Sequence, residues 1–180
     1  MALGFSVFET ALGWCGVIGT EERIHGCLLP EESPERVRAR FLRLHRDARE
    51  EPPGPSRQAA IARIRGLIEG ANDDLCDLDL DMSAVSDFER RVYELARAVR
   101  PGQTTTYGEI ARALGDLNES RAVGVALGRN PFAPIVPCHR VVAAGQKLGG
   151  FSATGGRSLK LSMLANESRW AADDLFGRGS

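Results

Sequence analysis

Apolar residues in the first thirty positions fall into three short runs that predict three β-strands. Glycines and the pair Glu21-Glu22 separate the runs. Short apolar runs bounded by such residues are typical of strands joined by tight turns. The apolar positions are Phe5, Val7, Phe8, Trp14, Val17, Ile18, Ile24, Leu28 and Leu29.

A helix is expected after the third strand. Ser33 is a typical N-cap residue, and Pro34 suits the first helical turn. Val37, Phe41 and Leu44 recur at spacings of four and three, which predicts one apolar helix face.

Residues 50–56 hold three prolines and a glycine, which predicts a loop before a second helix. That helix is marked by Ile61, Ile64, Leu67 and Ile68, and it is expected to end at Gly70. The acidic run at 73–81 then predicts a linker between two domains, with a short strand around Leu78 and Leu80.

The second half of the chain is predicted to be mostly helical. Ser86 with Glu89, and Thr106 with Glu109, each match the capping box that opens a helix. The second of these helices should run to Gly115, and a turn at 116–118 should lead to a helix over 119–127. Two short helices joined by a tight turn form a helix-turn-helix pattern, although such corners also occur in domains that do not bind DNA.

The remaining segments carry weaker patterns. Residues 135–142 are expected to be extended and buried, and 149–152 to form a glycine-rich loop. A final helix is predicted over 160–167, and residues 168–180 are expected to be poorly ordered.

Charge is divided unevenly along a chain whose net charge is -1. Residues 1–85 hold 10 Lys/Arg and 15 Asp/Glu, whereas residues 86–169 hold 12 and 7. The basic half could meet phosphate, and the alternative is chance patterning on solvated helices.

The four cysteines, at 15, 27, 76 and 138, show no paired spacing. We find neither a secretory leader nor an apolar stretch of the roughly 20 residues that span a bilayer. These features predict a cytoplasmic protein with free thiols, and no membrane partner.

The run Pro137-Cys138-His139-Arg140 places a nucleophile beside a titratable base. A thiolate is the reactive form of cysteine, and a neighbouring imidazole can take up the thiol proton. The alternative is a buried structural thiol, which is the usual fate of a free cysteine.

This run and the residues around it resemble the O6-alkylguanine-DNA alkyltransferases. The likeness covers roughly residues 85–167 and rests on N-P-x-x-P-I-V-P-C-H-R-V-V, on G-Q-T-T-T-Y-G-E-I-A and on N-E-S-R-A-V-G. It implies an α+β fold: a ribonuclease-H-like α/β domain over 1–80, then a mostly helical domain with a helix-turn-helix over 81–170, and a tail over 171–180. It also implies irreversible transfer of the alkyl group of O6-alkylguanine, and of O4-alkylthymine, to the protein's own cysteine.

The resemblance also implies roles for individual residues. Cys138 is the acceptor, and His139 acts on it through a bound water and is oriented by Glu167. Asn130 braces the turn around the cysteine, and Tyr107 donates a hydrogen bond to the base and helps to rotate it outward. Arg140 is expected to form a structural salt bridge.

The expected partner is double-stranded DNA containing alkylated guanine, bound by a monomer without cofactor or metal. Arg121 would enter the base stack in place of the flipped base. The other DNA-binding candidates are Ala122, Thr105, Thr106 and Arg129. The expected substrate pocket consists of Val141, Phe151 and Ser152.

Two departures and two alternatives accompany this interpretation. Phe151 stands where many members have tyrosine, and the loop at 153–156 is longer than usual. One alternative is a lesion-binding module without transfer, which Cys138 disfavours. The other is a transcription regulator, which would need base-reading side chains that E-S-R-A-V-G-V-A-L-G lacks. A zinc site at Cys15, His25 and Cys27 has no convincing spacing.

Overall fold

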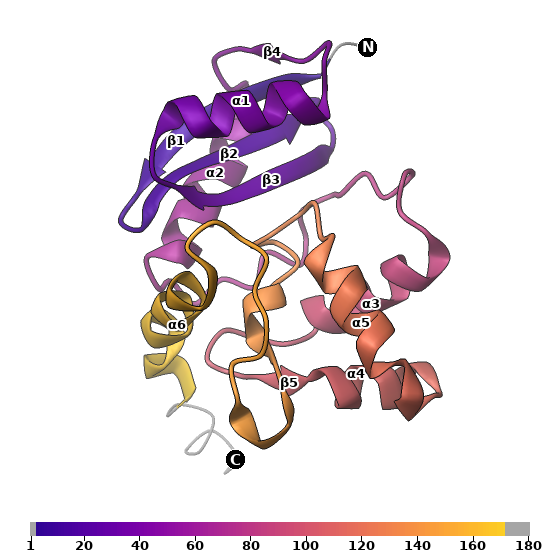
Figure 1. The fold of residues 1–180 in the computed structure, drawn as a ribbon. Coiled ribbons are helices and arrows are strands. Elements are labelled where there is room, and N and C mark those ends of the chain that lie inside the picture. Colours follow the sequence, from indigo (N-terminus) through magenta and orange to yellow (C-terminus); the bar gives the residue numbers. More distant parts are fainter. Residues whose placement is uncertain (1–2, 172–180) are drawn as a thin grey trace, which may run out of the picture.

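The computed structural model describes residues 3–171 and shows a mixed α+β fold (Figure 1). A four-stranded sheet has the order β3-β2-β1-β4. Strands β1, β2 and β3 are antiparallel neighbours, and β4 runs parallel to β1. The bounds are β1 Gly4–Thr10, β2 Gly13–Gly19, β3 Ile24–Glu31 and β4 Arg49–Glu50. The three strands predicted between residues 3 and 29 are confirmed.

Helices α1 (Pro34–Leu44) and α2 (Pro55–Ile68) cover opposite faces of this sheet (Figure 1). Adjacent residues of a strand point to opposite faces, so Ile18 joins the core under α1 and Val17 the core under α2. Close packing of α1 depends on Gly16, where an added Cβ would lie 2.3 Å from the Phe41 ring.

The boundaries of these two helices correct two predictions. Leu44 was expected on the buried stripe of α1 but is 58% exposed, because the helix ends there and His45 is its C-cap. The predicted loop at 50–56 is shorter than expected, because Glu50 belongs to β4 and Pro55 already starts α2.

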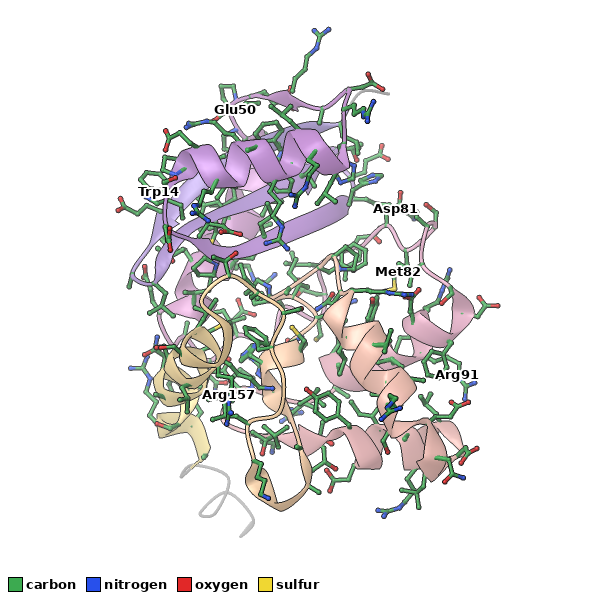
Figure 2. The ribbon with its side chains drawn as sticks, in the orientation of Figure 1. Trp14, Glu50, Asp81, Met82, Arg91 and Arg157 are labelled. Atoms are coloured by element: carbon green, nitrogen blue, oxygen red, sulfur yellow. The ribbon has the colours of Figure 1, made fainter. Side chains whose placement is uncertain are left out.

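Asp81 and Met82 lie in the segment that joins the sheet to the helical half (Figure 2). The strand predicted around Leu78 and Leu80 is a single bridge between Leu80 and Ile24. Arg97 holds the segment, since its guanidinium donates to the carbonyls of Leu75, Cys76 and Leu78.

Both predicted capping boxes are present, at the starts of α3 (Asp87–Arg97) and α4 (Tyr107–Leu114). Helix α4 ends at Gly115, whose φ of 108° is available to glycine without strain. A short turn η1 (Leu117–Glu119) then leads to α5 (Ser120–Gly128).

The prediction that residues 135–142 are extended is wrong around Cys138, where the chain forms a turn, but the segment is largely buried, as expected. Residues Cys138–Arg140 form the 3₁₀ turn η2, and only Val141–Val142 form a strand, β6, which pairs in parallel with β5 (Thr105–Thr106). The turn closes because the Arg140 amide donates to the Pro137 carbonyl. A further 3₁₀ turn, η3, spans Ala144–Gln146.

Helix α6 (Gly156–Glu167) starts before the predicted position and packs beside α2. Residues 168–171 were predicted to be poorly ordered, which is wrong. Trp170 and Arg169 both donate to the Gly70 carbonyl, which faces them at the end of α2. The rest of the predicted tail, 172–180, lies outside the described residues. In the part of the chain that is described, no helix is long and apolar enough to cross a membrane.

Candidate active site

Cys138 lies half-buried in the wall of a cavity of about 760 Å³, which we call the thiol cavity. The β-turn-like η2 positions the cysteine, and α4, α5 and the loop at 149–155 supply the other walls. Besides Cys138, the lining includes Tyr107 from α4, Arg121 from α5, and Phe151 and Ser152 from the loop. Five of the predicted site residues, which lie in four separate segments of the chain, therefore line one cavity.

Asn130 braces the turn that carries the cysteine. Its side-chain amide donates to the Val136 carbonyl at 2.8 Å, and its carbonyl oxygen accepts from the Phe132 amide at 2.9 Å. The Cys138 amide donates to the same Val136 carbonyl. This amide side chain thus takes the place of backbone partners that a proline-rich turn cannot provide.

His139 and Arg140 are both buried and share one carboxylate, that of Glu167 at the end of α6. His139 Nε2 lies 2.9 Å from Glu167 Oε1. The Arg140 guanidinium donates to both carboxylate oxygens, at 2.8 and 2.9 Å, and to the Val99 carbonyl at 2.7 Å. The salt bridge expected of Arg140 is present.

The ionisation of Glu167 determines which nitrogen of His139 is a base. Burial raises the pKa of this carboxyl, but the hydrogen bonds from His139 and Arg140 outweigh it and lower the pKa to about 2. An ionised carboxylate only accepts, so we assign the proton of the neutral imidazole to Nε2. Nδ1 then carries the lone pair, and it is buried with no hydrogen-bond partner among residues 3–171.

The thiol and the imidazole are both neutral at rest. Burial raises the pKa of Cys138, while the Asn130 side chain and the Lys160 ammonium act in the opposite direction. Burial also lowers the pKa of His139, against the effect of Glu167. A neutral imidazole beside a protonated thiol is the state from which a base can take a proton.

Lys160 is a site residue that the sequence analysis missed. Its ammonium is fully buried, donates to the Val141 carbonyl at 2.7 Å, and lies 5.9 Å from the centre of the Tyr107 ring and 5.6 Å from that of Phe151. Burial lowers its pKa to about 8, and Cys138 in its thiolate form acts against this shift. A signal was available, because Lys160 shares one helix face with Met163 and Glu167 at spacings of three and four.

Tyr107 and Ser152 make hydrogen bonds that shape the cavity. The Tyr107 hydroxyl donates to the Gly150 carbonyl at 3.4 Å, and burial raises its pKa, so it stays a donor. The Ser152 hydroxyl donates to the Gly128 carbonyl at 3.0 Å. Val141, predicted in the substrate pocket, is fully buried and is not part of the lining of the thiol cavity.

The predicted DNA-binding residues lie around the rim of this site. Arg121 is exposed and lines the thiol cavity together with Thr106, whose hydroxyl caps α4. Ala122 and Arg129 line an adjoining groove between α3 and α5. Thr105 donates to Glu109 and does not line the thiol cavity.

The discounted zinc candidates have other surroundings. Cys15 and Cys27 are buried in the sheet, and burial raises the pKa of both thiols, that of Cys15 to about 12. His25 pairs with Asp81 at 3.2 Å. No group of three or more His, Cys, Asp or Glu suited to a metal ion occurs in residues 3–171.

Known proteins resemble the part of the chain that contains this site. Residues 87–169 match the family model of the 6-O-methylguanine DNA methyltransferase DNA-binding domain. A methylated-DNA–protein-cysteine methyltransferase of Mycolicibacterium paratuberculosis is 45% identical over 99 residues, 55% of this chain and 58% of that protein. A DNA base-flipping protein of Thermus thermophilus is 41% identical over 121 residues, 64% of this chain and 80% of that protein.

The likeness extends to whole structures. A crystal structure of Mycobacterium tuberculosis OGT in complex with DNA superposes with a TM-score of 0.74, at 28% identity over 96% of this chain and 97% of that one. The O6-methylguanine-DNA methyltransferase of Pyrococcus kodakaraensis gives 0.71, also at 28% identity, over 92% and 98%. With its relatives and its fold in agreement, the chain belongs to the 6-O-methylguanine DNA methyltransferase family.

Proposed function

We propose that the protein repairs O6-alkylguanine in DNA by moving the alkyl group irreversibly onto Cys138. The observation that carries this proposal is the pairing of His139 Nε2 with Glu167, at 2.9 Å, in the residue that follows a cavity-lining thiol. It leaves Nδ1 as the one basic nitrogen of the ring. Single use follows from the chemistry, because removal of the alkyl group from the thioether would have to expel the cysteine thiolate, which is a poor leaving group from an alkyl carbon.

The first step is proton removal. The thiol proton of Cys138 passes through one bridging water to Nδ1 of His139, and the imidazolium that forms is stabilised by the Glu167 carboxylate. Arg140 keeps that carboxylate ionised and fixed. Lys160 adds a positive charge that favours the thiolate, in a site where low polarity strengthens the interaction.

The second step is an in-line displacement at the alkyl carbon. The sulfur forms a bond to carbon as the carbon–O6 bond breaks, and the electron pair of that bond passes to the guanine. The guanine then gains a proton, so that the products are guanine and an S-alkyl cysteine. Tyr107, which stays protonated, donates to the base as negative charge develops on it.

The base must leave the duplex to reach the thiol, and this requires a DNA-binding face. We infer that α4, η1 and α5 act as a helix-turn-helix that meets the minor groove, with Ala122 allowing close approach and Thr105, Thr106 and Arg129 near phosphates. Arg121 fills the stack left by the flipped base, which costs a few kcal/mol to extrude. Phe151 and Ser152 form the pocket wall.

The remaining expectations are part of the same proposal. The sheet with α1 and α2 forms a ribonuclease-H-like domain over 1–80, and 81–170 forms the DNA-binding and acceptor domain, in a monomer on double-stranded DNA. The chain spans 58% of the length of the methyltransferase of Mycolicibacterium paratuberculosis, so alkyl transfer by this protein is a proposal. Free thiols at all four cysteines fit a cytoplasmic location.

Incubation with a duplex that carries O6-methylguanine tests the proposal. Intact-protein mass spectrometry should show one added methyl group, peptide mapping should place it on Cys138, and the duplex should regain guanine. Cys138→Ala should abolish the gain in mass while leaving DNA binding within about twofold. A native protein that gains no mass under reducing conditions would refute alkyl transfer.

One observation favours a second candidate, a lesion-recognition protein that flips bases without transfer. The chain covers 80% of a relative named a DNA base-flipping protein. The cavity-lining thiol and its neighbouring base favour transfer, because binding alone needs neither. Tight binding to the lesion without methylation of Cys138 would support the second candidate.

A further inference from the structure

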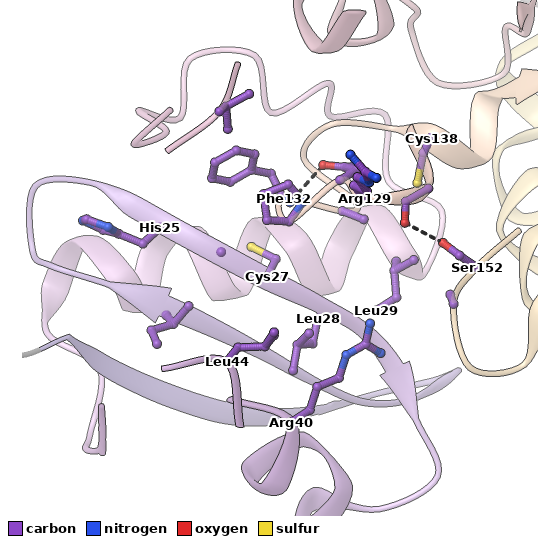
Figure 3. A pocket seen from close by; sticks show the side chains of 18 of the residues that line it. His25, Cys27, Leu28, Leu29, Arg40, Leu44, Arg129, Phe132, Cys138 and Ser152 are labelled. Carbon is purple, nitrogen blue, oxygen red and sulfur yellow. Dashed lines mark hydrogen bonds between the residues drawn. The ribbon is translucent and has the colours of Figure 1, made fainter. Parts of the chain in front are cut away.

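A second cavity also reaches the acceptor cysteine (Figure 3). It has a volume of about 400 Å³ and lies between strand β3, helix α1 and the segment at 127–133. We call it the β3 cavity. Its volume is within the range of small-molecule pockets, roughly 300–1,000 Å³. Cys138 thus belongs to the walls of two cavities. Of the predicted DNA-binding residues, Thr106 and Arg121 line the thiol cavity, and Arg129 lines the β3 cavity.

The two cavities share five lining residues, which are Leu127, Gly128, Cys138, Phe151 and Ser152. One hydrogen bond crosses this shared wall, from the exposed Ser152 side chain to the Gly128 carbonyl. Figure 3 shows it next to Cys138. A single hydrogen bond at the surface is a weak partition, because water can replace it when it opens.

The sheet supplies the far wall of the β3 cavity. Leu28 and Leu29 of β3 and Phe41 of α1 line it. The loop that carries Phe151 and Ser152 is fastened to this wall, because Thr154 donates to Glu31 at 2.9 Å and Arg40 donates to the same oxygen at 2.8 Å. The β3 cavity therefore extends from the Cys138 wall to the sheet and is partly open to solvent.

Of the His, Arg and Asp side chains that line the β3 cavity, His25, Arg40 and Asp81 form ion pairs, and His45 and Arg129 are the other members of the set. His25 pairs with Asp81, and Arg40 pairs with the buried Glu31. The remaining lining is rich in apolar side chains, including Val85, Leu127 and Phe132. An apolar ligand gains most from such a space, because burial of apolar surface is favourable and needs no unpaired polar partner.

We propose that the β3 cavity receives the distal part of long, apolar O6-alkyl groups while their first carbon reacts at Cys138. The inference rests on the proposed function and names its substrate class: guanine adducts with straight chains well beyond methyl. Sulfur bonds to the first carbon, the carbon–O6 bond breaks with its electron pair going to guanine, and the chain stays on the sulfur inside the cavity. The N-terminal sheet thereby becomes a determinant of lesion range.

Variants that fill the cavity from its mouth test this inference. Ala84→Trp and Leu44→Trp each place a large side chain in the cavity, from two separate segments that line it. Both residues are exposed, so folding should be retained. Leu42→Trp is the matched control on α1, since Leu42 is 45% exposed and does not line this cavity. Ala59→Trp, on an exposed position of α2, is the control for Ala84.

Single-turnover transfer rates are measured on duplexes carrying O6-methyl-, O6-butyl- and O6-octylguanine, with the adduct on Cys138 identified by mass. The native protein and both controls should transfer all three groups. Each filling variant should keep the methyl rate within about twofold and slow the octyl transfer at least about tenfold, because a chain excluded from an apolar pocket loses about that much per methylene or two.

Three results would overturn the inference. They are methyl transfer without octyl transfer by the native protein, an octyl rate that the filling variants leave unchanged, and an equal loss on methyl and octyl substrates. Each leaves the proposed function standing, provided that the native protein transfers methyl. Failure of the native protein to transfer methyl would overturn the proposed function itself.

Discussion

Replacement of Glu167 by glutamine removes one charge from a buried cluster and changes almost nothing in shape. The carboxylate is 1% exposed and faces two buried partners, His139 and Arg140. Arg140 keeps only one good acceptor on the glutamine and the Val99 carbonyl, so its buried guanidinium loses its counter-charge. His139 loses the group that orients it and stabilises its protonated form.

The structure sets the size of the effect on stability. A pKa lowered from 4.5 to about 2 corresponds to about 3 kcal/mol of stability at neutral pH, at about 1.4 kcal/mol per unit. Removing one partner of a buried ion pair generally costs about 3–5 kcal/mol, which agrees. For a chain of this length, the midpoint of thermal unfolding should fall by roughly 6–12 °C.

The pH dependence of this loss has a definite sign. The folded-state pKa of Glu167 is lower than the unfolded one, so the unfolded state binds more protons between the two values. Its stabilising contribution is therefore complete above about pH 4.5 and is lost as pH falls towards 2. The difference in unfolding free energy between the native protein and Glu167→Gln should shrink over that window.

Urea unfolding at pH 7 and at lower pH measures the free energies, and single-turnover methyl transfer measures the reaction. Transfer should fall at least about a hundredfold, as expected for loss of an oriented general base. Glu94→Gln is the control, because Glu94 is exposed and such substitutions change stability by less than about 0.5 kcal/mol. If the unfolding free energy of Glu167→Gln at pH 7 lies within about 1 kcal/mol of the native value, the account of this cluster is wrong, because loss of a buried ion-pair partner should cost about 3–5 kcal/mol.

Three further substitutions test separate parts of the structure. Lys160→Met should lower methyl transfer about tenfold at pH 7, because it removes a charge that favours the thiolate. The ratio of the native to the variant rate should decline as pH rises through about 8, where Lys160 loses its proton. A ratio that is independent of pH would exclude this role. Gly16→Ala should destabilise the fold by about 1–3 kcal/mol in urea unfolding, since its Cβ would lie 2.3 Å from the Phe41 ring, whereas Gly66→Ala, with its nearest neighbour at 3.5 Å, should not destabilise it. Arg121→Ala should slow transfer from duplex DNA at least about tenfold but leave transfer from a single strand nearly unchanged, because a single strand needs less base extrusion; an equal loss on both substrates would contradict the role of Arg121 in the base stack.

Local signals in the chain were sufficient for most of the secondary structure. The capping pairs Ser86–Glu89 and Thr106–Glu109 placed the starts of α3 and α4 correctly, because a capping box is made entirely by residues within one helical turn. The three strands and the Ser33 cap of α1 were also predicted correctly, because their signals lie within short stretches of neighbouring residues.

One prediction failed where a distant segment decides the conformation. The segment that follows α6 is held by the Gly70 carbonyl, 100 positions earlier in the chain, which accepts from Trp170. The extended conformation expected around Cys138 failed for a local reason, because the Asn130 side chain and the Pro137 carbonyl close a turn there. Neither partner is visible from a periodicity of apolar residues.

The amino-acid sequence alone predicted Cys138 as the acceptor and His139 as its base, since the motif that carries these groups is continuous in the chain. Only the tertiary structure decided that Glu167 is shared by His139 and Arg140, that the charge of Lys160 acts on the thiol from between two aromatic rings, and that a second cavity reaches the cysteine from the sheet. Chemical identity is a local property of the chain. The pKa of a group and the room around it depend on burial and on charges, and packing of distant segments sets both.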